Sequence, residues 1–290
     1  MPEGDTIYRT ARTLSRALVG KAITRFETGY AAIAAADDQE PFLGQVTTQI
    51  EARGKWLLIH FADGRILATH MLMSGSWHIY RPGERWQESR RNARIVLETE
   101  DFVAVAFRVP VARILSEHSL ARDPAIPKPE RDVLGASFDS EAAIHRLKSH
   151  PEDELAHALL RQTMLAGVGN VFKSEICFLT GLSPFRSVAT LSESQLKDVV
   201  STAQRLLAAN VLEDSGGQIV TYSGRKRRTT RNADPGESLW VYGRRGKSCR
   251  RCGAPIERCL QGPQARVTYW CPVCQPVQAW GGNPDDFQVR

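Results

Sequence analysis

The chain has 290 residues, of which 42% are hydrophobic and 24% charged, so it can form more than one packed core and is neither a disordered chain nor a disulfide-bonded miniprotein. The 38 Lys and Arg exceed the 32 Asp and Glu, and the excess is local: residues 221–270 hold twelve basic and three acidic residues, or +9, which leaves −3 elsewhere. Such a segment is typical of phosphate binding, although a solvated basic face has the same composition. No apolar run reaches the roughly 18 residues of a membrane helix and the polar first residues are unlike a signal peptide, so we expect a cytoplasmic protein without a membrane partner.

The first predicted element is an amphipathic helix, because apolar residues recur at helical spacing from Ile7 to Leu18 and Gly20 ends the pattern. From Ile23 to about Val109 the sequence favours short strands separated by Gly, Asp and Pro turns. The expected strands are 45–50, 56–61, 65–71, 77–80, 95–98 and 102–107. This pattern predicts an antiparallel sandwich or barrel.

A proline-containing stretch, residues 123–139, is a poor helix or strand and is predicted to be an interdomain linker. Beyond it, helical patterns cover residues 140–148, 152–162, 170–179 and 193–210. Ser192 and Gln195 form the sequence signature of a capping box at the start of the last helix. The glycine-rich segment 165–170 lies between the second and third patterns, so we expect two helices joined by a turn.

Four of the six cysteines form two C-x-x-C pairs with 18 residues between them, namely Cys249, Cys252, Cys271 and Cys274. This spacing predicts a zinc ion held by four thiolates, with disulfides as the alternative interpretation. Four protein ligands leave no open coordination position, so we expect the Zn²⁺ to be structural.

The predicted role of the zinc is to hold a hairpin, residues 255–270, that carries Arg258 and Arg266. Cys177 falls in a predicted helix and is expected not to be a ligand. Cys259 lies inside the hairpin and is the one competing ligand.

Several motifs occur in an order that resembles the formamidopyrimidine-DNA glycosylase and endonuclease VIII family over nearly the whole chain, with an opening closer to the endonuclease VIII branch. They are Met1-Pro2-Glu3-Gly4, Arg53-Gly54-Lys55, His70 with Met73-Ser74-Gly75, residues 165–175, Val241-Tyr242-Gly243-Arg244 and the four cysteines. The resemblance implies an α+β protein: an N-terminal antiparallel β-sandwich with a terminal helix, then a helical domain with a helix-two-turn-helix motif and a zinc ribbon. The implied parts are a catalytic sandwich (1–122), a linker (123–139), a helical domain with a mobile basic loop (140–235) and a zinc-ribbon hairpin with a tail (236–290).

Pro2 can act as a nucleophile through its backbone nitrogen once Met1 is removed. Removal of Met1 is expected before a proline and exposes a secondary amine at Pro2, and an α-amino group titrates near pH 8, so a usable fraction is neutral and nucleophilic. Attack on a deoxyribose C1′ displaces a base and leaves an iminium without an N–H to lose, which favours β-elimination, with δ-elimination as a possible next step. By resemblance Glu3 is the catalytic carboxylate that transfers a proton. The alternative for both residues is an ordinary polar terminus.

The resemblance also implies residues that contact DNA. Lys55 and His70 are expected at the backbone around a flipped nucleotide, with Lys55 also in the catalytic group, although an ordinary surface lysine is the alternative. Asn170, after a glycine turn and at a helix start, is an expected phosphate ligand. The remaining DNA-contacting candidates are Met73 as the intercalating side chain, with a core methionine as the alternative, Tyr242 and the hairpin residue Arg266.

The chain departs from the family pattern at Thr6, where most relatives carry a second glutamate, so an auxiliary acid role there is lost or moved. No Arg-x-Phe wedge occurs in residues 101–113, which leaves Arg108 without a clear assignment. Activity on single strands therefore remains open beside activity on duplexes. The cluster Arg225–Arg231 falls at a loop that reads lesions in relatives, and its composition indicates phosphate affinity.

The sequence as a whole predicts a monomeric, nucleoid-associated DNA glycosylase and abasic-site lyase of base-excision repair, which acts on oxidised bases and favours pyrimidines. Its partner is damaged DNA, duplex or single-stranded. One rival is a noncatalytic DNA-binding protein that uses the same helix pair and ribbon. A second rival, a zinc-dependent hydrolase, is disfavoured because four thiolates fill the metal's coordination shell.

Overall fold

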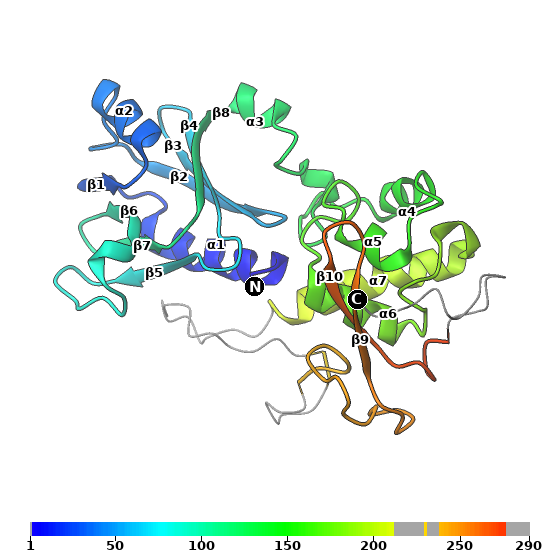
Figure 1. Ribbon diagram of the computed structural model, residues 1–290. Coiled ribbons are helices and arrows are strands. Elements are labelled where there is room, and N and C mark those ends of the chain that lie inside the picture. The colour runs from blue at the N-terminus through cyan, green and yellow to red at the C-terminus, as the bar shows by residue number, and fades with distance from the viewer. Residues whose placement is uncertain (1, 212–228, 231–237, 277–290) are drawn as a thin grey trace. The chain divides into compact units, whose positions relative to one another are not determined.

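The computed structural model describes residues 2–211, 229–230 and 238–276 (Figure 1). Of these, residues 2–135 and Val211 belong to one compact unit, and residues 136–210, 229–230 and 238–276 belong to a second. The first unit contains α1 (Gly4–Leu18), β1 (Arg25–Thr28), α2 (Ala31–Gln39), β2 (Thr47–Arg53), β3 (Trp56–Phe61), β4 (Arg65–His70), β5 (Ser76–Tyr80), β6 (Ala93–Glu98), β7 (Val103–Phe107), β8 (Val111–Ser116) and α3 (Glu117–Arg122). The second contains α4 (Ser140–Lys148), α5 (Leu155–Leu160), α6 (Asn170–Leu179), α7 (Glu193–Ala209), β9 (Glu257–Gln261) and β10 (Arg266–Trp270). None of the helices in these ranges has the length and apolar character needed to cross a membrane.

The first unit is the predicted antiparallel sandwich. One four-stranded sheet has the order β1-β6-β7-β5 and the other has the order β2-β3-β4-β8, and all strand pairs are antiparallel. Alternate side chains of both sheets and the apolar face of α1 share one buried core. Leu14, Leu57, Leu67 and Leu97 are each at most 1% exposed within it. This burial of one face per strand holds the two sheets together.

Helix α1 runs antiparallel to β2, because Val19 bridges Thr47 and the Ser15 hydroxyl donates to the Ile50 carbonyl at 3.2 Å. From Ser15 back to Gly4 the helix rises about 16 Å, and from Ile50 on to Lys55 an extended strand advances about the same distance. The first residues of the protein therefore lie at the same end of the sandwich as the turn that carries Lys55.

The expectation of an all-β region from Ile23 to Val109 was wrong in one part. Helix α2 forms at Ala31–Gln39, a run of strong helix formers with five alanines, and it buries Ile33. Strands β1 and β8 and helix α3 were not predicted. Strand β8 is half-buried along most of its length and has no clear alternation, so its sequence carries a weak strand signal.

The stretch 123–139 has a single 3₁₀ turn, Pro129–Arg131, and is otherwise irregular. It is nevertheless packed, since Ile126 and Val133 are buried and the Trp56 indole N–H donates to the Ala125 carbonyl at 2.9 Å. Asp132 is also buried.

In the second unit, α4, α6 and α7 confirm the predicted helices. The Ser192 hydroxyl and the Gln195 side chain form the predicted capping box at the start of α7. Helix α5 is shorter than expected and covers Leu155–Leu160, because the preceding backbone pairs with Ser187 instead of continuing the helix. Strands β9 and β10 form the predicted hairpin, which packs against α6.

Candidate functional site

Two of the predicted DNA-contacting residues meet at one end of the sheet that contains β3 and β4. Lys55 lies in the turn between β2 and β3, and His70 is the last residue of β4. Trp56 pairs with His70 in the strand register, and their rings pack edge to face with centroids 5.1 Å apart. The sheet register thus places Lys55 next to His70, as the shared role implied.

The His70 ring is neutral at physiological pH. Burial lowers the pKa of His70, and the ammonium of Lys55 lowers it further, to about 4. The backbone N–H of Leu72 donates to Nδ1 of His70 at 3.1 Å, so Nδ1 is an acceptor and the ring proton belongs on Nε2. His70 can therefore donate an Nε2–H hydrogen bond to an anion without carrying a charge.

The turn that presents Lys55 is held by a residue that sequence reasoning assigned only to the linker. Gly54 adopts φ 63°, and its N–H donates to a carboxylate oxygen of Asp132 at 2.7 Å. The second oxygen of Asp132 accepts from the Leu134 N–H at 3.0 Å, and burial raises the pKa of this carboxyl. Asp132 is one of four acidic residues in the stretch 123–139, and the sequence did not show which of them meets a partner 78 residues away.

Met73 projects from the turn between β4 and β5. Its side chain is 76% exposed, which contradicts the alternative of a core methionine, and the neighbouring Leu72 holds a left-handed φ of 44°. Gly75 closes the turn, and a Cβ atom there would lie 2.8 Å from the Met71 carbonyl oxygen and 3.0 Å from the Val109 Cα. The tight packing of Gly75 fixes the turn that exposes Met73.

Arg108, left without assignment by the sequence, borders the same turn. It also adopts a left-handed φ, 48°, its carbonyl accepts from the Ser74 hydroxyl at 3.4 Å, and its guanidinium pairs with Glu88. The segment that carries Arg108 is thus adjacent to the segment that carries Met73.

Pro2 and Glu3 lie at the start of α1, and Met1 lies outside the described residues. Glu3 is fully buried and is the N-cap residue, and its carbonyl accepts from the N–H groups of Thr6 and Ile7 at 3.0 and 3.1 Å. The Thr6 hydroxyl donates to the Asp5 carboxylate at 3.3 Å, so the position where relatives carry glutamate holds a local hydrogen bond. A fully buried carboxylate at a helix N-terminus is not an ordinary polar terminus.

In the second unit, Asn170 is the first residue of α6, and the glycine turn precedes it as expected. The side chain of Gln162 organises this turn: its amide donates to the carbonyls of Leu160 and Val168 at 2.9 and 3.0 Å, and its oxygen accepts from Gly167 N–H at 3.0 Å. Sequence reasoning missed Gln162, whose only signal was its place at the end of a helical pattern.

Tyr242 is fixed through its backbone by Glu175, another residue that was quoted in a motif but given no role. One Glu175 oxygen accepts from the N–H groups of Val241 and Tyr242, each at 2.9 Å, and the other accepts from the Trp240 N–H at 2.9 Å and from the Thr229 hydroxyl. Glu175 is fully buried in α6, where every residue from Val171 to Phe178 is buried, so its carboxylate needs hydrogen-bonding partners.

The four predicted ligands form one cluster, in which the Sγ atoms of Cys249, Cys252, Cys271 and Cys274 all lie within 4.8 Å of one another. Two of the separations, Cys249 to Cys274 and Cys252 to Cys271, are 3.8 and 3.4 Å. A tetrahedral Zn²⁺ with Zn–S bonds near 2.3 Å requires sulfurs about 3.8 Å apart. The cluster therefore fits zinc.

Backbone N–H groups favour the ionised form of the Cys249 thiol. Burial opposes ionisation of Cys249, but N–H groups that include that of Arg251, 3.4 Å from the sulfur, lower the pKa of this thiol to about 7. Cys259 lies outside the cluster, and burial raises the pKa of its thiol. Cys259, the competing candidate, is therefore not part of the ligand cluster.

Arg266 is exposed at the start of β10, directly after the hairpin turn, where Ala265 has φ 48°. The Tyr269 ring of the same strand packs against the Tyr242 ring, with centroids 4.9 Å apart. Basic residues Arg225, Lys226, Arg227, Arg228 and Arg231 of the predicted lesion-reading loop lie outside the described residues.

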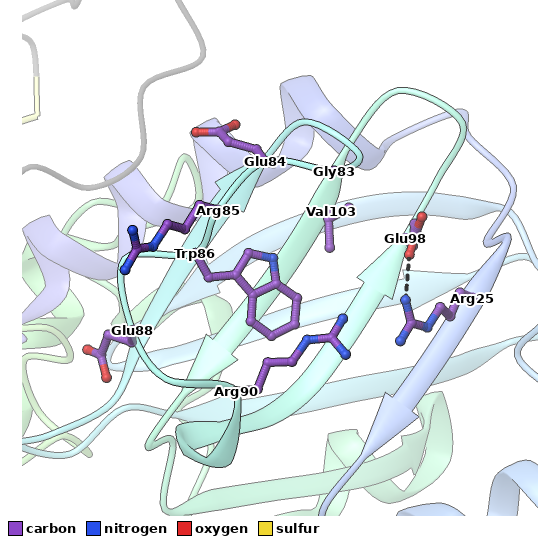
Figure 2. Close-up of a pocket in the computed structure, with 9 residues that line it drawn as sticks. All are labelled: Arg25, Gly83, Glu84, Arg85, Trp86, Glu88, Arg90, Glu98 and Val103. Carbon is purple, nitrogen blue, oxygen red and sulfur yellow. Dashed lines mark hydrogen bonds and ion pairs between the residues drawn. The ribbon is translucent and has the colours of Figure 1, made fainter.

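A hollow of about 400 Å³ lies on the outer face of the β1-β6-β7-β5 sheet, beside the Trp86 ring (Figure 2). Its carboxylates have partners: Glu98 pairs with Arg25, as the dashed line in Figure 2 shows, and Glu88 pairs with Arg108. None of the residues predicted from the sequence to act lines this hollow.

Known protein families and relatives match this chain over most of its length. The N-terminal domain of formamidopyrimidine-DNA glycosylase matches residues 1–110, and the helix-two-turn-helix (H2TH) domain of the same enzyme matches residues 130–222. The chain is 37% identical to a probable endonuclease 8 2 of Streptomyces coelicolor, with 98% of both chains covered. It is also 37% identical to the DNA-(apurinic or apyrimidinic site) lyase Nei2 of Mycolicibacterium smegmatis, with 95% of this chain and 99% of that protein covered.

Among solved structures, the chain is similar to Lactococcus lactis Fpg in complex with DNA that contains an abasic site, with a TM-score of 0.77, 22% identity, and 94% and 99% of the two chains covered. At this identity the likeness concerns the fold. The two domain matches and the relatives of similar length, together with the sandwich, the α5–α6 turn and the cysteine cluster, show that the chain belongs to the formamidopyrimidine-DNA glycosylase and endonuclease VIII family.

Proposed function

We propose that the protein is a bifunctional DNA glycosylase and abasic-site lyase that removes oxidised bases, with a preference for pyrimidines, through an iminium formed at Pro2. The observation that carries the proposal is the gathering of the start of α1, Lys55 and His70 at one end of the sandwich, next to the exposed Met73. The names of the relatives, endonuclease 8 and DNA-(apurinic or apyrimidinic site) lyase, support it.

The first step forms a bond between the Pro2 nitrogen and C1′ of the damaged nucleotide. The bond from C1′ to the base breaks, and the base leaves with the bonding electrons and takes up a proton. The C1′–O4′ bond then opens as O4′ is protonated, and the nitrogen becomes an iminium. We assign these proton transfers to Glu3, which follows Pro2 in the chain and is buried at the start of α1.

Strand scission follows from the electron demand of the iminium. Loss of a proton from C2′ sends its electrons toward the nitrogen, and the bond from C3′ to the 3′ oxygen breaks, so the phosphate leaves by β-elimination. Water then hydrolyses the iminium and returns the Pro2 amine. Lys55 and the Nε2–H of His70 hold the phosphates that flank the lesion, and Met73 fills the space that the flipped nucleotide leaves.

The four cysteines would hold a structural Zn²⁺, which supplies rigidity to the hairpin that carries Arg266 and leaves no coordination position for substrate. Asn170, Tyr242 and Arg266 contact the backbone of the damaged DNA in this proposal.

The decisive experiment is borohydride trapping on an oligonucleotide with one abasic site. We expect a covalent protein–DNA adduct whose peptide map places the DNA on Pro2, and mass spectrometry of the purified protein should show that Met1 is absent. A noncatalytic DNA-binding protein would give no adduct with an intact Pro2, and this result would reject the proposal. The control is the Pro2→Gly variant, which has a primary amine in place of the secondary amine and should trap more slowly.

A panel of single lesions, each in duplex and in single-stranded form, tests the substrate preference. We expect faster cleavage at oxidised pyrimidines than at 8-oxoguanine. The opposite order would overturn the preference while leaving the lyase chemistry intact.

A further inference from the structure

A chain of buried polar side chains connects α6 to the zinc hairpin. The Lys173 ammonium donates to the Thr268 hydroxyl at 2.8 Å, and that hydroxyl donates to the Gln261 side-chain oxygen at 2.7 Å. The Gln261 amide donates to the Glu154 carboxylate at 2.7 Å and to the Pro184 carbonyl at 3.1 Å. Lys173 is 1% exposed and Thr268 is not exposed at all.

The direction of every hydrogen bond in this chain is fixed by its ends. Lys173 can only donate, so the Thr268 oxygen accepts and its proton is left for the Gln261 oxygen. The amide of Gln261 must then face Glu154 and Pro184, because a reversed amide would bring three acceptors together. A chain that starts at a cation and ends at an anion has one arrangement, and removal of the Thr268 hydroxyl takes one buried acceptor away from the Lys173 ammonium.

Gln261 and Thr268 lie close to Arg266 in the hairpin, one on each strand. Gln261 is the direct register partner of Arg266, and Thr268 lies two residues further along β10. Tyr269 adds a second attachment, since its N–H donates to the Ser174 hydroxyl of α6 at 3.3 Å. These buried side chains therefore fix the part of the hairpin that carries the exposed Arg266.

We propose that Lys173, Thr268 and Gln261 are positioning residues that hold Arg266 at a fixed place relative to Asn170, which lies one turn before Lys173 on α6. The proposal rests on the proposed function in one respect, the contact of Arg266 with a phosphate. Because Thr268 has no exposed surface, it cannot touch DNA, and any effect of its hydroxyl on binding must act through the hairpin.

The test uses a matched pair of variants at one buried position. Thr268→Val keeps the shape and removes the hydroxyl, whereas Thr268→Ser keeps the hydroxyl. Binding to abasic-site duplex is measured from 50 to 300 mM salt in the zinc-loaded protein. We expect Thr268→Val to lower the slope of log K against log salt by up to about 0.9, the value for one lost phosphate contact, and Thr268→Ser to retain the wild-type slope.

The Arg266→Ala background shows whether the effect passes through Arg266. There, Thr268→Val should change the slope no further, because the contact it controls is already absent. Full additivity of the two substitutions, or a wild-type slope in folded Thr268→Val, would overturn the proposal. Lys148→Met serves as a control lysine, since Lys148 is exposed and pairs with Glu193, and it should leave the hairpin unchanged.

A second variant covers the case in which Thr268→Val does not fold because the Lys173 ammonium loses a buried acceptor. Lys173→Met with Thr268→Val removes both partners, which costs far less than removing one. This double variant should fold, bind zinc and still show the lowered slope.

Hydrogen exchange of the β9 and β10 amides is a readout that needs no DNA. Exchange should be faster in Thr268→Val and in the double variant than in the wild type and Thr268→Ser. Unchanged exchange would reject the positioning role, whereas absence of borohydride trapping in the wild type would reject the proposed function and leave the exchange result standing.

Discussion

The Leu72 N–H reaches back to Nδ1 of His70 at 3.1 Å, so the turn that exposes Met73 also orients the imidazole beside Lys55. Two residues that the sequence suggested for different tasks, backbone contact and intercalation, therefore depend on one turn. A change in this turn would alter the orientation of His70 as well as the position of Met73.

His70 gives a prediction about pH. Its pKa of about 4 lies below the ordinary 6.5, so as pH falls from 6.5 the unfolded chain takes up a proton before the folded protein does. The stability that comes from the neutral ring is complete above about pH 6.5 and is lost as pH falls toward 4. The His70 ring signals in NMR should not titrate between pH 8 and 5.5. In urea unfolding, His70→Asn should reduce the loss of stability over pH 6.5 to 4, and an NMR midpoint near 6.5 would contradict the assignment.

Substitutions at Met71 and Met73 can separate the effect of core packing from the effect of DNA contact. Met71 is 2% exposed and Met73 is 76% exposed. We expect Met71→Ala to lower the free energy of unfolding by about 2–4 kcal/mol and Met73→Ala to change it by less than about 0.5 kcal/mol. Activity on duplex lesions should instead fall in Met73→Ala, and single-turnover cleavage measures it. Equal destabilisation by the two substitutions would argue against an exposed probe.

The cysteine cluster predicts the metal content of the protein. We expect about one zinc per chain by mass spectrometry of the metal, with Cys252→Ser losing most of it and Cys259→Ser retaining it. Chelation should weaken DNA binding because the hairpin loses its anchor. Full zinc content in Cys252→Ser, or its loss in Cys259→Ser, would show that the ligand set is different.

Glu175 gives a prediction about stability. Glu175→Ala would remove the acceptor of one buried N–H group, two partly buried N–H groups and a hydroxyl, and we expect a loss of about 3 kcal/mol by calorimetry. Glu175→Gln keeps one oxygen for two of the N–H groups and should fall between Glu175→Ala and the wild type. A neutral effect of Glu175→Ala would mean that the segment with Tyr242 is held by other contacts.

The helices α1, α6 and α7 could be predicted because local pattern and end signals agree, as with Ser192 and Gln195 at the start of α7. Helix α2 was missed because short runs between strands were assigned to the surrounding β pattern, although Ala31–Gln39 has high helix propensity. The cysteine cluster was predictable because its signal is also local: the two ligands of each pair are close in sequence.

The residues that position the site could not be predicted. Asp132 acts on Gly54, Glu175 acts on Trp240 to Tyr242, and Lys173 acts on Thr268, each across more than 60 residues of sequence. A single sequence shows that a charged residue falls in an apolar stretch but not which partner it meets. The candidate groups that touch substrate came from motifs, whereas those that hold them in place required the fold.

Gly75 sits where the backbone of one loop rests directly on the backbone of another, with no side chain between them. This contact fixes the spacing between the loop that ends at Gly75 and the loop that contains Arg108 and Val109. Any bulkier residue at position 75 would press on the backbones of Met71 and Val109, and would therefore displace the turn that exposes Met73 and the segment that carries Arg108 together.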